Sequence, residues 1–314
     1  MNQASRARLV AHVRSRKARI ILGSAIILLS IGFLAYFIYR NWNALSTHEW
    51  TPDYAQLAMT LLFHLIAFII AIGAWHSMIG RLAGSADWFL NARIYCYSAV
   101  ARRLPGVAWD IATRVAMYDH AGLSIAIVGV VSILEWIIIT LSGILLYVAL
   151  TPFTLSYVLQ WGMWPLLGAA ALGSLLIHPR LIRCVLHRAR KGELPAPLRY
   201  RDTLWWLFLY AWTWIVSGLM LFATVRIIYP LTSSHLLQLL ADWILVGVLT
   251  SFASFVPTSM ALKEVTLTLL MSRYMPEYIA VVAAILMRVL TVAYSILWTL
   301  CSTQFRRAPT SSER

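Results

Sequence analysis

Charged residues follow a proline at two places in an otherwise apolar chain. A charge near the centre of a bilayer costs about 2.5–3.5 kcal/mol, so charges held there usually serve a function. Cations near a helix N-terminus suit an anionic group such as a phosphate. These segments predict a polar binding site inside a membrane. Its candidate residues are Pro105, Gly106, Asp110 and Arg114 in the first segment, and Pro257, Thr258, Ser259, Lys263 and Glu264 in the second.

The prolines predict irregular backbone at both places. Proline has no N–H and fixes its own φ, so it begins helices well and interrupts them badly. Backbone left unpaired at membrane depth must be buried in protein or line a water-filled cavity. Helices that begin at Gly106 and at Thr258 and Ser259 would direct partial positive charge toward the break. The alternative is a plain interfacial loop at each place.

Two further charges lie in the middle of long apolar runs and join the candidate site. Glu135 lies near the centre of the run at 122–150, and Arg288 lies near the centre of the run at 278–300. Neither side chain reaches an interface easily, so each needs a buried partner or a wet cavity. The two could also simply neutralise one another.

Spacing predicts how some of these charges pair. Asp110 and Arg114 are four residues apart, so they share one face of a helix and can form an ion pair. Lys263 and Glu264 are adjacent, about 100° apart on a helix, and should contact different partners. Four other polar residues in apolar segments carry less weight: Asp242, His64, His76 and Arg226.

The chain carries none of the common signatures of soluble enzymes. It has no His-Glu-x-x-His, Gly-x-Ser-x-Gly or Gly-Lys-Ser/Thr motif. Cys96, Cys184 and Cys301 are isolated and match no metal or redox spacing. We therefore predict no metal and no cofactor, and an enzymatic role is the weaker interpretation.

The composition is that of an all-α, polytopic membrane protein. Hydrophobic residues make up 61% of the 314 residues and charged residues 12%, about half the usual share in soluble domains. The mean hydropathy is +0.74. Many of the 14 Trp and 14 Tyr lie near the ends of apolar runs, as at membrane interfaces. The alternating strands of a membrane barrel are not evident in the sequence.

Basic residues gather in three places and set the expected topology. The net charge of +14 comes largely from an arm at 1–19, a loop at 179–203 and a tail at 301–314. Such bias marks cytoplasmic segments, so we expect a cytoplasmic membrane with both termini inside. It also explains the charge without a nucleic-acid partner, while the arm could contact anionic lipid.

Apolar length predicts about six full spans and two broken regions. The spans lie at about 20–39, 54–79, 122–150, 161–178, 204–228 and 278–300. The regions at about 86–117 and 236–273 each contain a proline break. Either both are re-entrant and enter from opposite sides, or 236–256 and 258–273 both cross and the total approaches eight. The first arrangement is an inverted repeat, and we favour it.

These spans make one transmembrane domain at 20–300. Its halves, about 20–178 and 204–300, are joined by the basic loop at 179–203, which we expect to be the largest aqueous piece. We predict no soluble domain and make no prediction of the oligomeric state.

Two ordered motifs carry a family resemblance. The first is Pro105-Gly106-x-x-Trp109-x-x-x-x-Arg114, then Gly122-Leu123-Ser124 and Glu135. The second is Pro257-Thr258-Ser259-Met260-Ala261-Leu262-Lys263-Glu264, then Arg288. In order and spacing they resemble the lysylphosphatidylglycerol synthase transmembrane-region family, also described as flippase-like integral membrane proteins. That family's second motif is Pro-Gly-Gly-Leu-Gly-Val-Arg-Glu, so its glycines are replaced here by Thr258, Ser259 and Ala261.

The resemblance implies a membrane domain that moves a modified lipid between leaflets. Fused members carry a soluble aminoacyl transferase after the membrane part; we expect this chain to be a stand-alone member without that activity. The leading hypothesis is translocation of a phospholipid or lipid-linked head group, with Arg114, Lys263 and Arg288 binding a phosphate. One half would rock against the other. The alternatives are a membrane partner of a lipid-modifying enzyme, or an intramembrane transferase with Glu135 or Glu264 as base.

Overall fold

The computed structural model describes most of the chain. The described residues are 36, 39, 42–47, 51–103, 109–154, 159–190, 198–253 and 259–304. All the regular structure in these residues is helical, so the all-α prediction is confirmed. The arm at 1–19, nearly all of the expected span at 20–39 and most of the tail at 301–314 lie outside the described residues.

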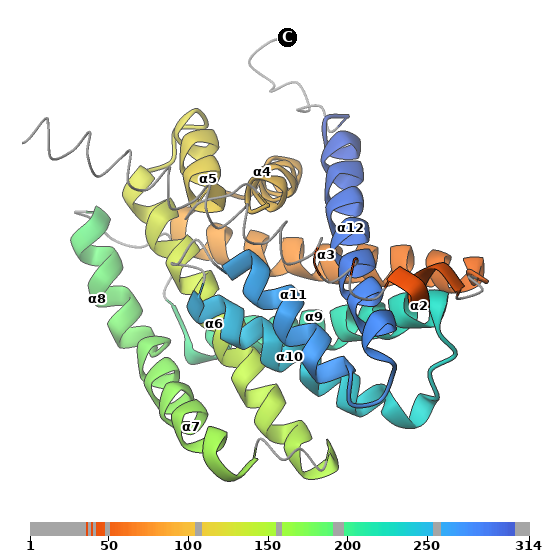
Figure 1. The fold of residues 1–314 in the computed structure, drawn as a ribbon. Coiled ribbons are helices and arrows are strands. Elements are labelled where there is room, and N and C mark those ends of the chain that lie inside the picture. The colour runs from red at the N-terminus through yellow and green to blue at the C-terminus, as the bar shows by residue number, and fades with distance from the viewer. Residues whose placement is uncertain are drawn as a thin grey trace, which may run out of the picture.

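The helices follow one another with short connections (Figure 1). In chain order they are α2 (Trp42–Thr47), α3 (Tyr54–Ala83), α4 (Trp88–Ala101), α5 (Trp109–Asp119), α6 (Ile125–Thr154), α7 (Leu159–Leu176), α8 (Pro179–Arg190), α9 (Tyr200–Ile228), the short 3₁₀ helix η1 (Ser233–His235), α10 (Leu236–Ala253), α11 (Ser259–Met271) and α12 (Glu277–Ser302).

Five of the described helical segments are long and apolar enough to cross a membrane, and they indicate an integral membrane protein. Four of them, in α3, α6, α9 and α12, coincide with predicted spans. The fifth runs from Ser233 to Phe252, within the region that we predicted as re-entrant at 236–273. Its 20 residues extend about 30 Å at 1.5 Å per residue, enough for a full crossing.

Three of the four helices that adjoin the two breaks are shorter. α4 has 14 residues, α5 has 11 and α11 has 13. At 1.5 Å per residue α11 is about 20 Å long, less than the hydrocarbon core of about 30 Å. The region at 236–273 therefore combines a helix long enough to cross with one that is too short, which neither predicted arrangement described. The inverted repeat stays a prediction.

The central basic loop contains a helix that the sequence analysis did not predict. α8 fills the first part of the segment at 179–203, and α9 begins already at Tyr200. Pro179 suits the first turn of α8 because that position needs no N–H donor. Apolar residues recur at helical spacing between the arginines, so α8 is amphipathic. Its Ile182 is buried, and the helix packs against α6.

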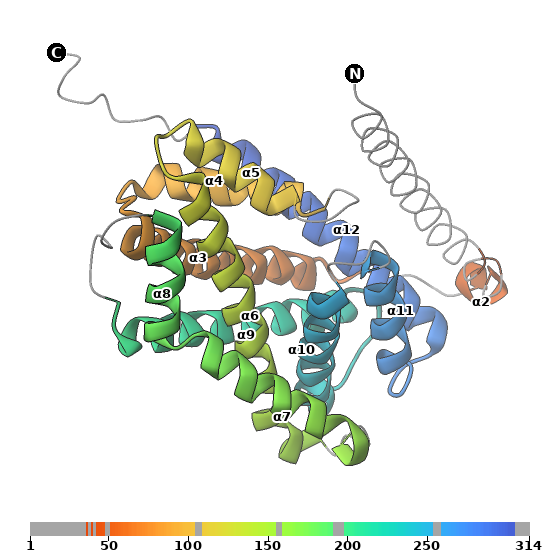
Figure 2. The ribbon, with the colours of Figure 1, turned by 90° about the vertical axis from the view of Figure 1, so that its left-hand side faces the viewer.

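An antiparallel pair of helices, α3 and α9, forms the centre of the molecule. The Asp53 N–H donates to the Ile227 carbonyl at 3.0 Å at one end, and Trp206 Nε1 donates to Ser77 Oγ at 3.0 Å toward the other. Two views show α3 and α9 side by side with α6 crossing them (Figures 1 and 2). This pair joins the two predicted halves, because α3 belongs to one and α9 to the other.

Small residues let a tryptophan fill the crossing of α6, α9 and α10. Trp214 of α9 donates its Nε1 proton to the Ile139 carbonyl of α6 at 3.0 Å. A Cβ atom added to Gly143 would lie 3.0 Å from Trp214 Nε1, and one added to Gly247 would lie 2.3 Å from the indole ring. The contact at Gly247 is too close for a larger residue and the one at Gly143 would force Trp214 to shift, so glycine at both positions permits this packing.

Candidate functional site

The first part of the site is a buried ion pair between α5 and α6. Arg114 Nη1 pairs with Glu135 Oε2, and the side chains are only 1% and 3% exposed. Arg114 Nε also donates to Ser98 Oγ of α4 at 3.0 Å, and the Tyr210 hydroxyl of α9 donates to Glu135 Oε1 at 2.7 Å. The pair therefore connects four helices and has hydrogen-bond partners on each of them.

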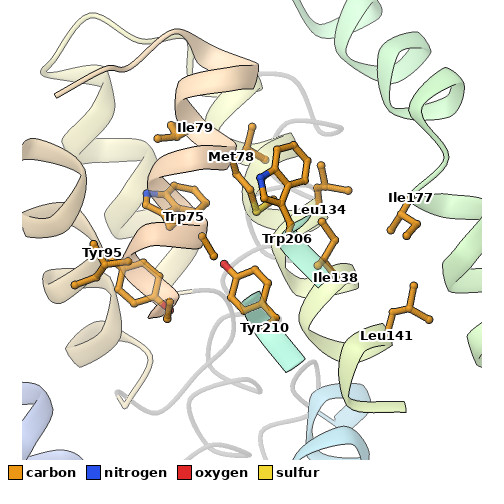
Figure 3. Packing of buried hydrophobic residues seen from close by; sticks show 14 of the residues in the cluster. Trp75, Met78, Ile79, Tyr95, Leu134, Ile138, Leu141, Ile177, Trp206 and Tyr210 are labelled. Atoms are coloured by element: carbon orange, nitrogen blue, oxygen red, sulfur yellow. The ribbon is translucent and has the colours of Figure 1, made fainter. Parts of the chain in front are cut away.

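Aromatic rings enclose the Arg114 guanidinium. Its central carbon lies 3.9 Å from the centroid of the Trp75 ring and 5.0 Å from that of Tyr95, as in cation–π contacts. Trp75, Tyr95 and Tyr210 lie close together in the core (Figure 3). Trp75 Nε1 donates in turn to the Tyr118 hydroxyl at 2.9 Å. A group so enclosed and so fully paired is suited to hold helices together.

The carboxylate of Asp110 pairs differently from the prediction. Asp110 Oδ2 accepts from Arg102 Nε at 3.0 Å, across the first break, instead of pairing with Arg114. The predicted pairing rested on i,i+4 spacing within one helix, but Arg114 faces the core and meets Glu135 there. The side chains of Arg102 and Asp110 are 46% and 22% exposed, so this pair lies nearer the surface.

The second part of the site joins α11 to α12. Arg288 Nη1 donates to Glu264 Oε1 at 3.1 Å, so Arg288 pairs with Glu264, and the suggested neutralisation by Glu135 is wrong. Lys263 points elsewhere, with its ammonium 4.2 Å from the centroid of the Trp243 ring on α10. The prediction that Lys263 and Glu264 contact different partners is confirmed.

Arg103 connects the two parts, and the sequence analysis missed it. It follows α4 directly, and its charge interacts with those of Glu264, Arg288 and Lys263. Its position two residues before Pro105 was a usable signal, since both breaks were recognised by their prolines.

The site as a whole carries more positive than negative charge. Its basic members are Arg102, Arg103, Arg114, Lys263 and Arg288, and its acidic members are Asp110, Glu135 and Glu264. Five cations and three carboxylates leave a surplus of two positive charges. Among the described residues three of the cations are in ion pairs, so the surplus resides there on Arg103 and Lys263.

Four predicted site residues lie outside the described part of the chain: Pro105, Gly106, Pro257 and Thr258. Ser259 begins α11, and its side chain is likewise outside it. The expected phosphate-binding helix N-termini at the two breaks therefore stay a prediction.

Comparison with protein-family models and with curated proteins found no match to this chain. The family resemblance therefore stays a prediction that rests on the two motifs. Among the residues that the structure describes, no group of three or more His, Cys, Asp or Glu side chains could hold a metal ion.

Two residues given less weight in the sequence have defined partners. His64 Nδ1 accepts from Trp298 Nε1 at 2.9 Å, which links α3 to α12. His76 Nδ1 lies 2.8 Å from Asn91 Nδ2, which links α3 to α4. Both contacts are structural ties between helices.

Asp242 is buried and joins α10 to the turn before α12. It accepts from Arg273 Nη2 at 2.5 Å and from the Tyr274 hydroxyl. Burial, and then the neighbouring carboxylate, raise the pKa of Tyr274 well above its usual value, so the phenol keeps the proton that it donates. The ring of His235 stacks on Tyr274 with centroids 5.5 Å apart. This cluster is separate from the cationic site.

Proposed function

We propose that this integral membrane protein moves a phospholipid or lipid-linked head group between the leaflets of the cytoplasmic membrane. The observation that carries the proposal is the surplus of two positive charges beside the two breaks, on Arg103 after α4 and on Lys263 of α11, among helices long enough to cross a bilayer. An unpaired positive charge is costly at membrane depth unless an anion binds beside it and neutralises it. The head groups of anionic lipids at the two interfaces are the anions closest to such a site.

The outer members of the site can meet a head group directly. The side chains of Glu264 and Arg288 are 23% and 43% exposed, so they are accessible while they remain paired. Arg114 and Glu135 are enclosed, so in this proposal they support the site and do not bind the lipid. The acyl chains would stay in the bilayer while the polar group passes along α5, α11 and α12.

The same geometry argues against an intramembrane transferase that uses Glu135 as base. Both of its oxygens accept hydrogen bonds, from Arg114 and from Tyr210. A substrate proton could reach either oxygen only by displacing one of these donors.

Lipid crossing in proteoliposomes tests the proposal. Purified full-length protein is reconstituted with labelled lipids of several head-group classes, and the fraction accessible from outside is followed over time. We expect faster crossing than in protein-free vesicles and slower crossing with Arg288→Gln. The matched control is Arg81→Gln, because Arg81 is 44% exposed and pairs with Asp202 at 3.2 Å, much as Arg288 pairs with Glu264.

Two results would overturn the proposal. One is crossing no faster than in empty vesicles for every lipid class tested. The other is equal loss in the Arg288 and Arg81 variants, which would assign the effect to folding. Stoichiometric recovery of a lipid-modifying enzyme, together with absent crossing, would instead favour the role of a membrane partner.

A further inference from the structure

The Arg103 side chain holds an unused hydrogen-bond donor beside the site. Its Nε atom is buried and has no hydrogen-bond partner among the described residues, although the side chain as a whole is partly exposed. A buried guanidinium nitrogen left without an acceptor costs free energy, more than a neutral donor would. The partial exposure leaves a way for an acceptor to reach it from outside the protein.

Lys263 is a second cation that forms no ion pair with a carboxylate of the described residues. None of the ion pairs between described residues includes it, and its ammonium rests on the face of Trp243, which is itself 7% exposed. An aromatic face offsets only part of the cost of desolvating an ammonium. Glu264 is the nearest carboxylate in sequence; its Oε1 pairs with Arg288, and its Oε2 is buried with no hydrogen-bond partner among the described residues.

The fold brings these two cations to one place. α12 contacts α4 through the hydrogen bond from Thr299 Oγ1 to the Cys96 carbonyl at 3.0 Å, and it contacts α11 through Arg288 and Glu264. Figure 2 shows α12 running from beside α4 to beside α11. The charge of Arg103 reaches Lys263, so the two cations repel one another when nothing lies between them.

We propose that Arg103 and Lys263 together bind a phosphate monoester, a group with about two negative charges. The inference rests on the proposed function, because it names the charge of the head group that the same site takes. A monoester carries about −1.5 to −2 at pH 7, which matches the surplus of two positive charges. A phosphodiester carries one negative charge and would leave one of the two cations without a counter-ion.

The two side chains suit different parts of such a group. A guanidinium presents parallel N–H donors that match two phosphate oxygens, while an ammonium acts as a compact point charge. Arg103 would supply the directed hydrogen bonds, and Lys263, held by Trp243, would supply the second charge. The phosphate could belong to a lipid with a terminal phosphate or be free phosphate, since both present the same chemistry.

Binding measurements on the full-length protein in lipid nanodiscs test this inference. Native mass spectrometry would compare retention of phosphatidic acid, a monoester, with that of phosphatidylglycerol, a diester. We expect the wild type to prefer the monoester, and Arg103→Gln and Lys263→Gln each to weaken its retention about tenfold to a hundredfold, as for loss of a charged hydrogen bond. The control is Arg93→Gln, because Arg93 is an exposed cation on α4 that stacks on Tyr97.

Further arms separate the outcomes. Competition by inorganic phosphate at equal concentration would support the monoester site and assign it to free phosphate. Arg103→Lys should keep part of the preference for the monoester, because lysine keeps the positive charge but lacks the parallel N–H donors of the guanidinium. Equal retention of the two lipids by the wild type, or an unchanged preference in the double Gln variant, would overturn the inference even if lipids still cross. Preserved monoester binding without crossing would instead overturn the proposed function.

Discussion

Replacing Glu135 with glutamine should lower the free energy of unfolding by about 3–5 kcal/mol, the usual cost of leaving one member of a buried ion pair alone. The loss of unfolding free energy should reach this range, because neither side chain of the pair is more than 3% exposed and water cannot replace the carboxylate. Glutamine has nearly the same volume and can still accept from Tyr210, so the loss reports the charge and not a cavity. The contact of Arg114 with Trp75 is present in both proteins and leaves the difference unchanged.

Equilibrium unfolding of the purified protein in mixed micelles measures this loss. The double variant Arg114→Met/Glu135→Leu removes both charges at similar volume, and it should recover most of the lost stability, since apolar replacement of buried pairs is often neutral. Arg81→Gln is the control, because its pair with Asp202 lies nearer the surface, with side chains 44% and 15% exposed, and should contribute no more than about 1 kcal/mol. A loss from Glu135→Gln no larger than that of the control would refute the reasoning, as would a double variant no more stable than the single one.

Gly218→Ala should destabilise the protein by about 1–3 kcal/mol, because its Cβ would lie 2.0 Å from Leu240 Cδ1. Gly129→Ala, where no atom lies within 4 Å, should not; equal thermal unfolding of the two variants would contradict the packing described. Asp242→Asn should cost about 1–3 kcal/mol by removing the charged acceptor of Tyr274, and hydrogen exchange should then quicken in the turn at 272–276. Unchanged exchange there would show that the carboxylate does not hold the turn.

The sequence predicted which residues matter better than it predicted their partners. Charges in apolar runs are visible one by one, and so Arg114, Glu135 and Arg288 could be selected without a structure. Their partners lie on other helices, and the rotation of one helix against another is set by the packing of many apolar side chains. The within-helix rule therefore proposed Asp110 for Arg114, although tertiary packing turns Arg114 toward Glu135.

For the helices too, some features could be predicted from the sequence and others could not. Span lengths followed from hydropathy, since a membrane helix must satisfy its backbone internally over a fixed thickness. α8 was not predicted because a cluster of basic residues indicates a cytoplasmic segment whether or not the segment is helical, and only the spacing of its apolar residues distinguishes the two. The end of α11 at Met271 lies close to the predicted boundary at 273, but its 13 residues are too few for the full crossing that one of the two arrangements expected.

The α3–α9 pair has a mechanical consequence for any transport by this protein. Backbone and side-chain hydrogen bonds join it at both ends, and Trp214 is enclosed between α6 and α10, so the two predicted halves cannot hinge apart without breaking their common centre. Motion would have to come from the short helices instead, with α3 and α9 as a stationary axis. A cysteine crosslink between α3 and α9 should then leave lipid crossing intact, whereas one between α4 and α12 should stop it.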